Sequence, residues 1–226
     1  MMEFVHDLIP NLERASDHLL QSLVQTLQMV FGSGLISFVL GIFFGVCLVV
    51  MRRGGILQNL VLYTLLEKTI NVIRSVPFLI LIILLIPLSR MIMGTAIGVQ
   101  GAIVPLVIGT VPFFSRQVET AVSEVDSGLV EASVAMGMSP LGIIWRVYLR
   151  ESIPALARVT QITAINLINL ATLAGAVGAG GLGDFAIRFG HQHGMRDLMW
   201  LTIAIILVMV SIVQGLGNIV IKKTTH

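Results

Sequence analysis

The sequence predicts an all-α membrane protein with five transmembrane helices in each subunit. Of its 226 residues, 56% are hydrophobic and 12% are charged, whereas an average soluble domain has roughly 25% charged residues. The mean hydropathy is +0.95, and the apolar residues lie in blocks long enough to cross a hydrocarbon core of about 30 Å. We expect spans at about residues 23–51, 57–88, 96–118, 155–176 and 198–221.

Short segments flank these spans at both ends of the sequence. Residues 1–18 contain four acidic side chains and only one arginine, so they lack the basic leader of a cleavable signal peptide. We interpret residues 1–22 as a lead-in that is periplasmic or lies at the membrane interface. Residues 223–226 are expected to be a cytoplasmic tail.

The first uncharged block contains a regular series of small residues. They recur every four positions, at Ser33, Ser37, Gly41 and Gly45. A stripe of small residues on one helix face allows another helix to approach closely in a membrane. The stripe is consistent either with packing inside one subunit or with a dimer interface.

The second expected span contains charged residues. Only residues 75–89 are free of charge, and a stretch of that length is too short to cross the core at about 1.5 Å per residue. We therefore expect a helix that begins earlier and bends near Pro77. Arg74, Ser75 and Pro77 either line the translocation path, because ionisable residues within spans are usually functional, or Arg74 snorkels to the cytoplasmic surface.

The fourth expected span carries polar side chains at regular spacing. Thr163, Asn166 and Asn169 lie three residues apart and so share a helix face. Buried amides are normally hydrogen-bonded. This face is therefore either a weakly polar wall of the translocation path or a site of hydrogen bonding between helices.

The segment that follows, residues 175–183, is too rich in glycine to remain a regular helix. Gly175, Gly178, Gly180 and Gly181 are candidates for a gate, because glycine permits backbone rearrangement. A close-packed loop explains the same composition equally well.

The distribution of positive charge predicts the orientation. Ten of the fourteen Lys and Arg residues fall on one side when the segment after the first span, the polar stretch before the fourth span and the C-terminal tail share that side. Such an excess marks the cytoplasmic side, which places the N-terminus in the periplasm. The ten are Arg52, Arg53, Lys68, Arg74, Arg116, Arg146, Arg150, Arg158, Lys222 and Lys223.

Several function classes lack the residues that they need. A Walker A loop ends in Gly-Lys-Ser/Thr, but the Lys-Thr pairs at 68–69 and 223–224 do not follow a glycine. We therefore expect a transport subunit that binds no cofactor and is not an enzyme. His191 and His193 have no defined third ligand, so no metal site is expected, and Cys47 is the only cysteine. A nucleic-acid partner is not expected either, because basic residues and aromatics do not form a stripe.

The most informative stretch is the polar segment 124–150, between the third and fourth expected spans. Asp126 and Ser127 are good N-cap residues. Glu131 is expected in the first helical turn, where a negative charge interacts favourably with the helix dipole. The pattern predicts that a short helix begins here.

A second short helix is predicted directly after the first. Gly137 is typical of the left-handed residue that ends a helix. Ser139 then caps a new helix with Pro140 at its first position, where a missing N–H has no cost. The hairpin would expose Leu129, Val130, Val134 and Met136 to water. An exposed apolar patch of this kind needs a protein to cover it, unless the segment is an ordinary interfacial hairpin between spans.

Glu131, Ala132 and Gly137 at this spacing, with Pro154 downstream, resemble the coupling loop of ABC importer permeases. In that family the loop inserts a short helix into a groove on a separate ATPase subunit. The resemblance implies ATPase contacts for Glu131, Ala132, Met136, Gly137, Ser139 and Pro140.

Four segments in order also resemble the methionine-uptake permease family. They are residues 71–78, 101–106, 131–137 and 175–183, and the likeness extends over about residues 20–222. It implies the type I ABC importer permease fold and a homodimer embedded in the lipid of the bacterial inner membrane. It also implies two ATPase subunits that bind ATP and Mg, and a periplasmic methionine-binding lipoprotein. Arg150 departs from the loop pattern, which usually has a proline there.

The function expected from this resemblance is a methionine path operated by alternating access and coupled to the ATPase through residues 131–140. Two alternatives remain open at this stage. One is an ABC permease for another small amino acid or a peptide. The other is a stand-alone channel or ion-coupled carrier, although the third to fifth expected spans lack the acidic residues of a proton relay.

Overall fold

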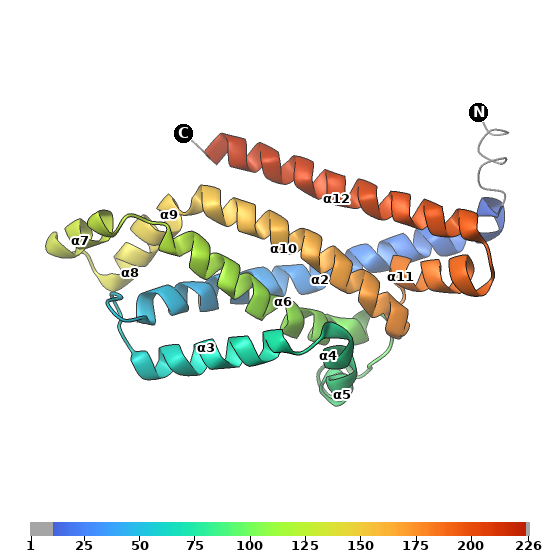
Figure 1. Cartoon of the computed structure of the whole chain (residues 1–226), viewed down its shortest axis with the longest axis horizontal. Helices are drawn as coiled ribbons and strands as arrows, with labels where there is room; N and C mark the ends of the chain where they lie inside the picture. The colour runs from blue at the N-terminus through green and yellow to red at the C-terminus, as the bar shows by residue number, and fades with distance from the viewer. Residues whose placement is uncertain (1–10, 225–226) are drawn as a thin grey trace. The chain divides into compact units, whose positions relative to one another are not determined.

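The computed structural model describes residues 11–224 and consists of helices and short connections, with no strand in that range (Figure 1). The all-α fold class is confirmed. Four helices are long and apolar enough to cross a membrane, and they correspond to the first, third, fourth and fifth expected spans. They are α2 (Leu12–Met51), α6 (Gly98–Ser123), α10 (Ile153–Ala174) and α12 (Arg196–Thr224).

Helix α2 begins before the first residue of the first expected span. Residues 12–22 of the expected lead-in form the first turns of α2, while residues 1–10 and, at the other end, 225–226 lie outside the described residues. Asn11, the residue before α2, is hydrogen-bonded to Asp197, the second residue of α12. The backbone N–H and side-chain amide of Asn11 donate to the carboxylate of Asp197 at 3.1 and 3.0 Å.

The second expected span is divided into α3 (Leu60–Ser75), α4 (Phe78–Leu84) and α5 (Ile86–Met93). The predicted bend near Pro77 is a complete break. Val76 has φ −83° and ψ 123°, the extended conformation that a following proline favours. The side chain of Asn59 starts α3 by accepting from the Leu62 N–H at 3.1 Å.

The remaining elements are short. They are α7 (Ser127–Ala135), α8 (Pro140–Ile143), the π-helical turn η1 (Ile144–Tyr148), α9 (Leu149–Glu151), the π-helical turn η2 (Gly175–Ala179), α11 (Gly181–Phe185) and the π-helical turn η3 (Ala186–Gln192). The first four of these connect α6 to α10, and the last three connect α10 to α12.

The chain forms two compact units. Unit 1 comprises the described residues through Leu35, Pro77–Val107 and Ala164–Val213. Unit 2 comprises Ile36–Val76, Ile108–Thr163 and the described residues from Gln214 onward. Each long helix contributes one part to each unit.

The core of unit 1 has two apolar clusters. The first joins α2, α6 and α10 through Met29, Leu106 and Leu167. The second places Ala15 of α2 against Phe185 of α11 and Leu198 of α12, which fixes the first turns of α2 in the unit.

The core of unit 2 packs α2 and α6 against the segment that follows α7. Its buried members are Val46, Val49 and Val50 from α2, Phe114, Val118 and Val122 from α6, and Ile143, Val147 and Tyr148 from α8 and η1. We call this set the unit 2 core.

Part of the small-residue stripe brings α2 close to α6 inside unit 2. A Cβ atom added to Gly41 would lie 2.3 Å from Cδ1 of Phe114, and one added to Gly45 would lie 2.5 Å from Cβ of Val118. Real Cβ atoms do not approach other carbons so closely, so glycine is required at both positions. The structure therefore supports the first interpretation of the stripe, packing inside one subunit.

Two hydroxyl groups in unit 2, Ser37 Oγ and Thr110 Oγ1, are enclosed and make no hydrogen bond within residues 11–224. An unsatisfied buried hydroxyl costs about 1–3 kcal/mol. We expect Thr110→Val, which keeps the side-chain shape and removes the polar atom, to stabilise the protein by about 1 kcal/mol. The measurement is the thermal unfolding midpoint in detergent. Gly45→Ala is the control and should lower that midpoint, and a fall for Thr110→Val would show that its hydroxyl has a partner.

Candidate functional site

The polar segment forms the helical hairpin that the sequence predicted. Asp126 starts α7, its side chain accepting from the Gly128 N–H at 2.7 Å. Ser139 starts α8, its hydroxyl oxygen accepting from the Gly142 N–H at 3.2 Å, and Pro140 occupies the first turn. These N-caps confirm the predicted helix starts.

Gly137 ends α7 with φ +76°. Its N–H donates to the Val134 carbonyl at 2.9 Å, and the Met138 N–H donates to the Ser133 carbonyl at 3.1 Å. This pair of bonds is the Schellman motif, which requires a left-handed residue at the position of Gly137. The turn between α7 and α8 is therefore fixed by the backbone of one glycine.

Glu131 does not lie in the first turn of α7 as predicted. The helix begins at Ser127, so Glu131 falls beyond the turn in which the helix dipole acts most strongly. Its side chain is exposed, as is that of Ala132. Glu131 is thus part of the outer surface of the hairpin and does not cap the helix.

One face of the hairpin is apolar and exposed. Met136 is 74% exposed, Leu141 67% and Val134 54%. Val130 was expected to face water with them, but it packs against the unit 2 core. Ser133 is buried on the same inner side, where its hydroxyl donates to the Leu129 carbonyl at 2.7 Å.

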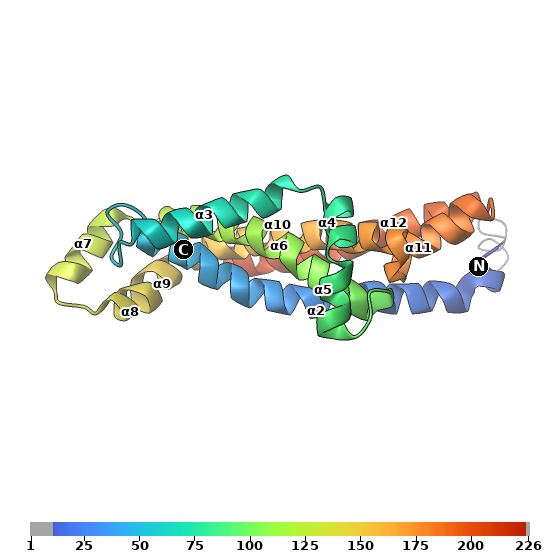
Figure 2. The ribbon, with the colours of Figure 1, turned by 90° about the horizontal axis from the view of Figure 1, so that it is seen from below.

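The second helix of the hairpin is less regular than the sequence predicted. After α8 it widens into the π-helical turn η1 before α9. Burial raises the pKa of the Tyr148 phenol in this turn, although the nearby Arg52 guanidinium acts in the opposite direction. Arg150 is exposed in α9, and Pro154 lies in the first turn of α10. Figure 2 shows α7 at one end of unit 2, beyond the start of α3.

The residues expected on the translocation path lie on α3, at the break that follows it and on α10. Arg74 and Ser75 end α3 and are exposed, and the Ser75 hydroxyl donates to the Asn71 carbonyl at 2.8 Å. Pro77 follows at the break between α3 and α4. Arg74 makes no ion pair with any described residue.

Thr163, Asn166 and Asn169 all lie on α10, as expected. Thr163 is buried, and its hydroxyl donates to the Val159 carbonyl at 2.8 Å. Asn166 is partly exposed and Asn169 is exposed. Neither amide makes a hydrogen bond within the described part of the chain.

The glycine-rich segment folds into η2 and the start of α11. Gly178 has φ +97° and open space around it, whereas a Cβ atom on Gly175 would lie 2.7 Å from the Gly180 carbonyl oxygen. Gly180 and Gly181 also have positive φ, 78° and 79°. The segment therefore contains one open glycine and several that are closely packed.

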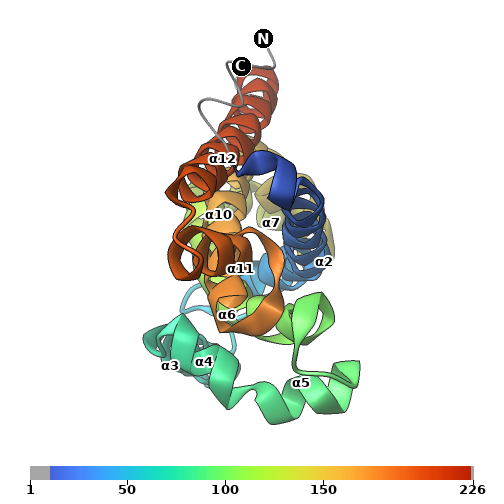
Figure 3. The ribbon, with the colours of Figure 1, turned by 90° about the vertical axis from the view of Figure 1, so that its right-hand side faces the viewer.

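Two side chains of α2 hold the start of α11, an arrangement that sequence reasoning missed. The Gly181 N–H donates to Oε1 of Gln25 and the Leu182 N–H donates to Oγ1 of Thr26, both at 2.8 Å. Figure 3 shows α11 beside the first part of α2 in unit 1. These contacts cap a helix that has no side-chain cap of its own.

His191 and His193 are exposed in η3 and after it. No group of three or more potential metal ligands occurs among the side chains that the structure describes.

Comparison with known proteins identifies the family. The model of the family "Binding-protein-dependent transport system inner membrane component" matches residues 37–225. The probable D-methionine transport system permease protein MetI of Vibrio cholerae is 43% identical over 211 residues, covering 93% of this chain and 94% of that protein. This chain belongs to the methionine permease family. The Pasteurella multocida protein of the same description is 39% identical over 205 residues, covering 91% and 94%.

A solved structure confirms the type I ABC importer permease fold of this family member. A chain of the MetNI methionine ABC transporter, in inward-facing conformations, superimposes with a TM-score of 0.92 and 39% sequence identity. The match covers 95% of the permease described here and 99% of that chain.

The permease also contains an ionic cluster in unit 2 that sequence reasoning did not pair. Arg116 of α6 lies 3.3 Å from Glu67 of α3 and 2.7 Å from Glu119. It also donates to the side-chain oxygen of Asn71 at 3.0 Å. Of the charges that made the second expected span unusual, that of Glu67 is thus paired with a cation of α6. A signal was present in the sequence, since Glu67 and Arg116 are both charged residues at the edges of apolar blocks.

Arg116→Met should destabilise the permease, because it leaves Glu67 and Glu119 without their cation. Breaking a fully buried pair costs about 3–5 kcal/mol. The side chains here keep 17–33% exposure, so we expect about 1–3 kcal/mol, seen as a lower unfolding midpoint. The matched control is Arg52→Met, which removes one exposed hydrogen bond to Ser123 and should change stability by no more than about 0.5 kcal/mol. Equal effects of the two variants would contradict a stabilising role for the cluster.

Proposed function

We propose that this permease is the membrane-spanning subunit of an ATP-driven importer and forms the path by which methionine crosses the bacterial inner membrane. The observation that carries the proposal is the likeness to the MetNI methionine ABC transporter over 95% of the chain. The MetI proteins of Vibrio cholerae and Pasteurella multocida, described as probable D-methionine permeases, support the same substrate.

The hairpin α7–α8 is the proposed docking surface for a separate ATPase subunit, which would bind ATP and Mg²⁺. The six residues that the coupling-loop resemblance selects are all exposed. They are Glu131, Ala132, Met136, Gly137, Ser139 and Pro140. The inner side of the same hairpin is anchored in the unit 2 core through Val130 and Ile143. A force applied to the outer face would therefore reach α2 and α6 through packed side chains.

The proposed orientation places the hairpin and the C-terminus in the cytoplasm and the N-terminus in the periplasm. Positive charge supports it. All ten basic residues expected on the cytoplasmic side belong to unit 2, which also contains the hairpin, and the other four belong to unit 1. An excess of Lys and Arg marks the cytoplasmic side of a membrane protein.

We propose a homodimer in lipid, with two ATPase subunits on the cytoplasmic side and a methionine-binding lipoprotein on the periplasmic side. A second subunit helps to enclose a central path. The polar residues proposed to line that path are Arg74, Ser75, Pro77, Thr163, Asn166 and Asn169. The amides of Asn166 and Asn169, which have no partner among the described residues, are available to a solute or to the second subunit. Gly175, Gly178, Gly180 and Gly181 are the proposed gate.

The test is uptake of labelled methionine into proteoliposomes that contain the permease, an ATPase subunit of the family and the binding protein. We expect uptake only when ATP is enclosed in the vesicles, on the side that the ATPase subunit faces. Unlabelled methionine should compete with the labelled methionine, and unrelated amino acids should not. Uptake without any ATPase subunit would instead support a channel or carrier.

Met136→Glu should separate the permease from its ATPase. The side chain is 74% exposed on the apolar face, and a charge buried without a partner in an interface costs several kcal/mol. We expect loss of copurification of the ATPase and loss of ATP-driven uptake, with unchanged amounts of permease in the membrane. Glu124→Gln, at an exposed position just before α7, is the control. Full copurification with the Met136→Glu variant would place the docking surface elsewhere.

A further inference from the structure

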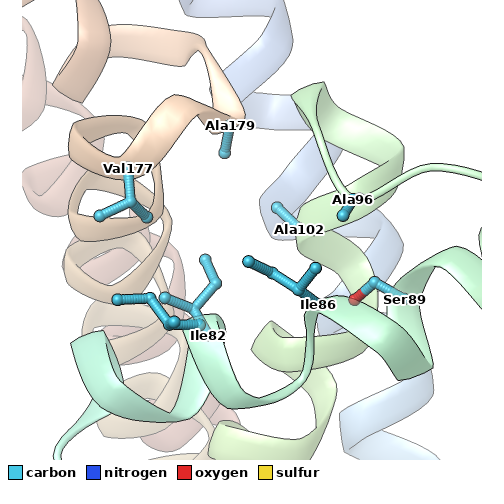
Figure 4. Close-up of a pocket in the computed structure, with 9 residues that line it drawn as sticks. Ile82, Ile86, Ser89, Ala96, Ala102, Val177 and Ala179 are labelled. Carbon is cyan, nitrogen blue, oxygen red and sulfur yellow. The ribbon is translucent and has the colours of Figure 1, made fainter.

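A cavity in unit 1 lies between α4, α5, the first turns of α6 and the π-helical turn η2. Its empty volume is about 370 Å³, including the space on its open side. Ile82 and Ile86 line it from one side, Ala102 from α6, and Val177 and Ala179 from η2 (Figure 4). The lining side chains are apolar apart from that of Ser89, while backbone atoms add polar surface, and η2 is part of the segment proposed as the gate.

One polar side chain breaks this apolar lining. Ser89 of α5 is only 1% exposed, and its hydroxyl makes no hydrogen bond within the described residues. Several other buried serines donate to a backbone carbonyl, whereas Ser37, like Ser89, has no partner among the described residues. Ser33 and Ser115, for example, donate to the carbonyls of Met29 and Val111 at 2.6 and 2.7 Å.

The orientation of Ser89 explains why its hydroxyl is unpaired. Figure 4 shows its oxygen on the side that faces Ile86 and the other lining residues. The fully enclosed hydroxyls without a partner among the described residues are those of Ser37 and Thr110, so the Ser89 oxygen keeps some accessible surface, on the side of the cavity. A ligand atom inside the cavity could therefore accept a hydrogen bond from it.

We propose that the cavity holds the thioether side chain of methionine during transport, with Ser89 Oγ donating to the sulfur. This inference rests on the proposed function and adds a binding site to it. A thioether is an unbranched apolar chain with one weak acceptor, which matches lining side chains that are apolar apart from one hydroxyl donor. The amino and carboxylate groups of the amino acid would remain at the open side, because the lining offers them no charged partner.

The position of the cavity also couples occupancy to the backbone around it. Val177 has φ −113° and ψ 23°, outside the helical region, and the next residue is Gly178 with φ +97°. A side chain seated against Val177 contacts backbone that departs from helical geometry in the connection between α10 and α12. Binding in the cavity and rearrangement of η2 therefore involve the same residues.

The first experiment measures access to position 89 in the full transporter complex. Cys47 is the only native cysteine, so Cys47→Ala provides a cysteine-free background for Ser89→Cys and, as the matched control, Ser33→Cys. Both positions are buried serines of unit 1, but only Ser89 faces the cavity. A small methanethiosulfonate reagent should label Ser89→Cys and not Ser33→Cys, and methionine supplied with ATP and binding protein should slow labelling several-fold.

The second experiment compares methionine with norleucine, in which a methylene group replaces the sulfur. The ratio of their uptake rates should fall by roughly two- to tenfold in Ser89→Ala, the range expected from one hydrogen bond. The binding protein selects between the two amino acids in the same way whether the permease is unmodified or carries Ser89→Ala. A change in the ratio of uptake rates therefore reports on Ser89. Ala96→Leu, which enlarges a side chain of the lining, should reduce uptake of both amino acids.

The results separate this inference from the proposed function. If the unmodified permease shows no ATP-driven methionine uptake, the proposed function fails. If it does, the inference is overturned by an unchanged methionine-to-norleucine ratio, by absence of labelling at position 89, or by labelling that methionine does not slow. Protection that depends on added phospholipid and not on methionine would assign the cavity to an acyl chain and would also overturn it.

Discussion

Gly137→Pro is expected to abolish ATP-driven uptake while the permease still inserts into the membrane. Proline fixes φ near −65° and has no backbone N–H, whereas Gly137 has φ +76° and donates to the Val134 carbonyl at 2.9 Å. The substitution therefore breaks the Schellman motif and redirects the chain between α7 and α8. The transmembrane helices do not depend on this turn, so the defect should be confined to the hairpin.

Two further substitutions at the same position make the test specific. Asn visits the left-handed region more readily than other residues with a side chain, and the space around Gly137 is open, so Gly137→Asn should keep most uptake. Gly137→Ala should be intermediate, since a left-handed alanine costs roughly 1–2 kcal/mol. The measurements are ATP-driven uptake and copurification of the ATPase. Normal values for the proline variant would contradict the coupling role of the hairpin.

The hairpin could be predicted from the sequence because its determinants are local. An Asx or Ser cap, a proline at the first position and a glycine at the end act within a few residues. Even so, Val130 was placed on the wrong face. Its environment depends on the unit 2 core, which is built from residues distant in the sequence.

The division of the second expected span was only partly predictable. The sequence indicated that Pro77 disturbs a helix, and the structure shows that the helix is interrupted completely. Val76 is extended, α3 ends before it, and a further break separates α4 from α5 at Leu85. The same proline can either bend a helix or end it. Which of the two occurs depends on whether neighbouring groups form hydrogen bonds with the backbone groups that lose their helical partners.

The pairings that hold distant elements together could not be predicted. Arg116 with Glu67 and the Gln25 cap on α11 join residues separated by 49 and 156 positions. The sequence shows that these groups are polar within apolar surroundings and so need partners. It does not show which partner each one has. The same limit applies to Ser89, whose lack of a partner is visible only in the structure.

Gly183→Ala is expected to be the most damaging single-methyl change in unit 1. A Cβ atom at this position would lie 1.9 Å from the carbonyl oxygen of Thr172. Thr172 lies near the end of α10, so the clash is between the backbones of two helices and cannot be relieved by a side-chain rotation. Over-packing typically costs 1–3 kcal/mol when side chains can adjust, and a backbone contact should exceed about 3 kcal/mol.

The variant should therefore give little folded permease, measured as a monodisperse fraction after purification and as a lower unfolding midpoint. Gly215→Ala is the matched control. It has no atom within 4 Å of its added Cβ and lies within α12, where alanine is a better helix former by about 1 kcal/mol. A stable Gly183→Ala variant would mean that α11 moves away from α10 at little cost. The close packing of residues 175–183 would then be a property of one state, and the segment would have the freedom that a gate requires.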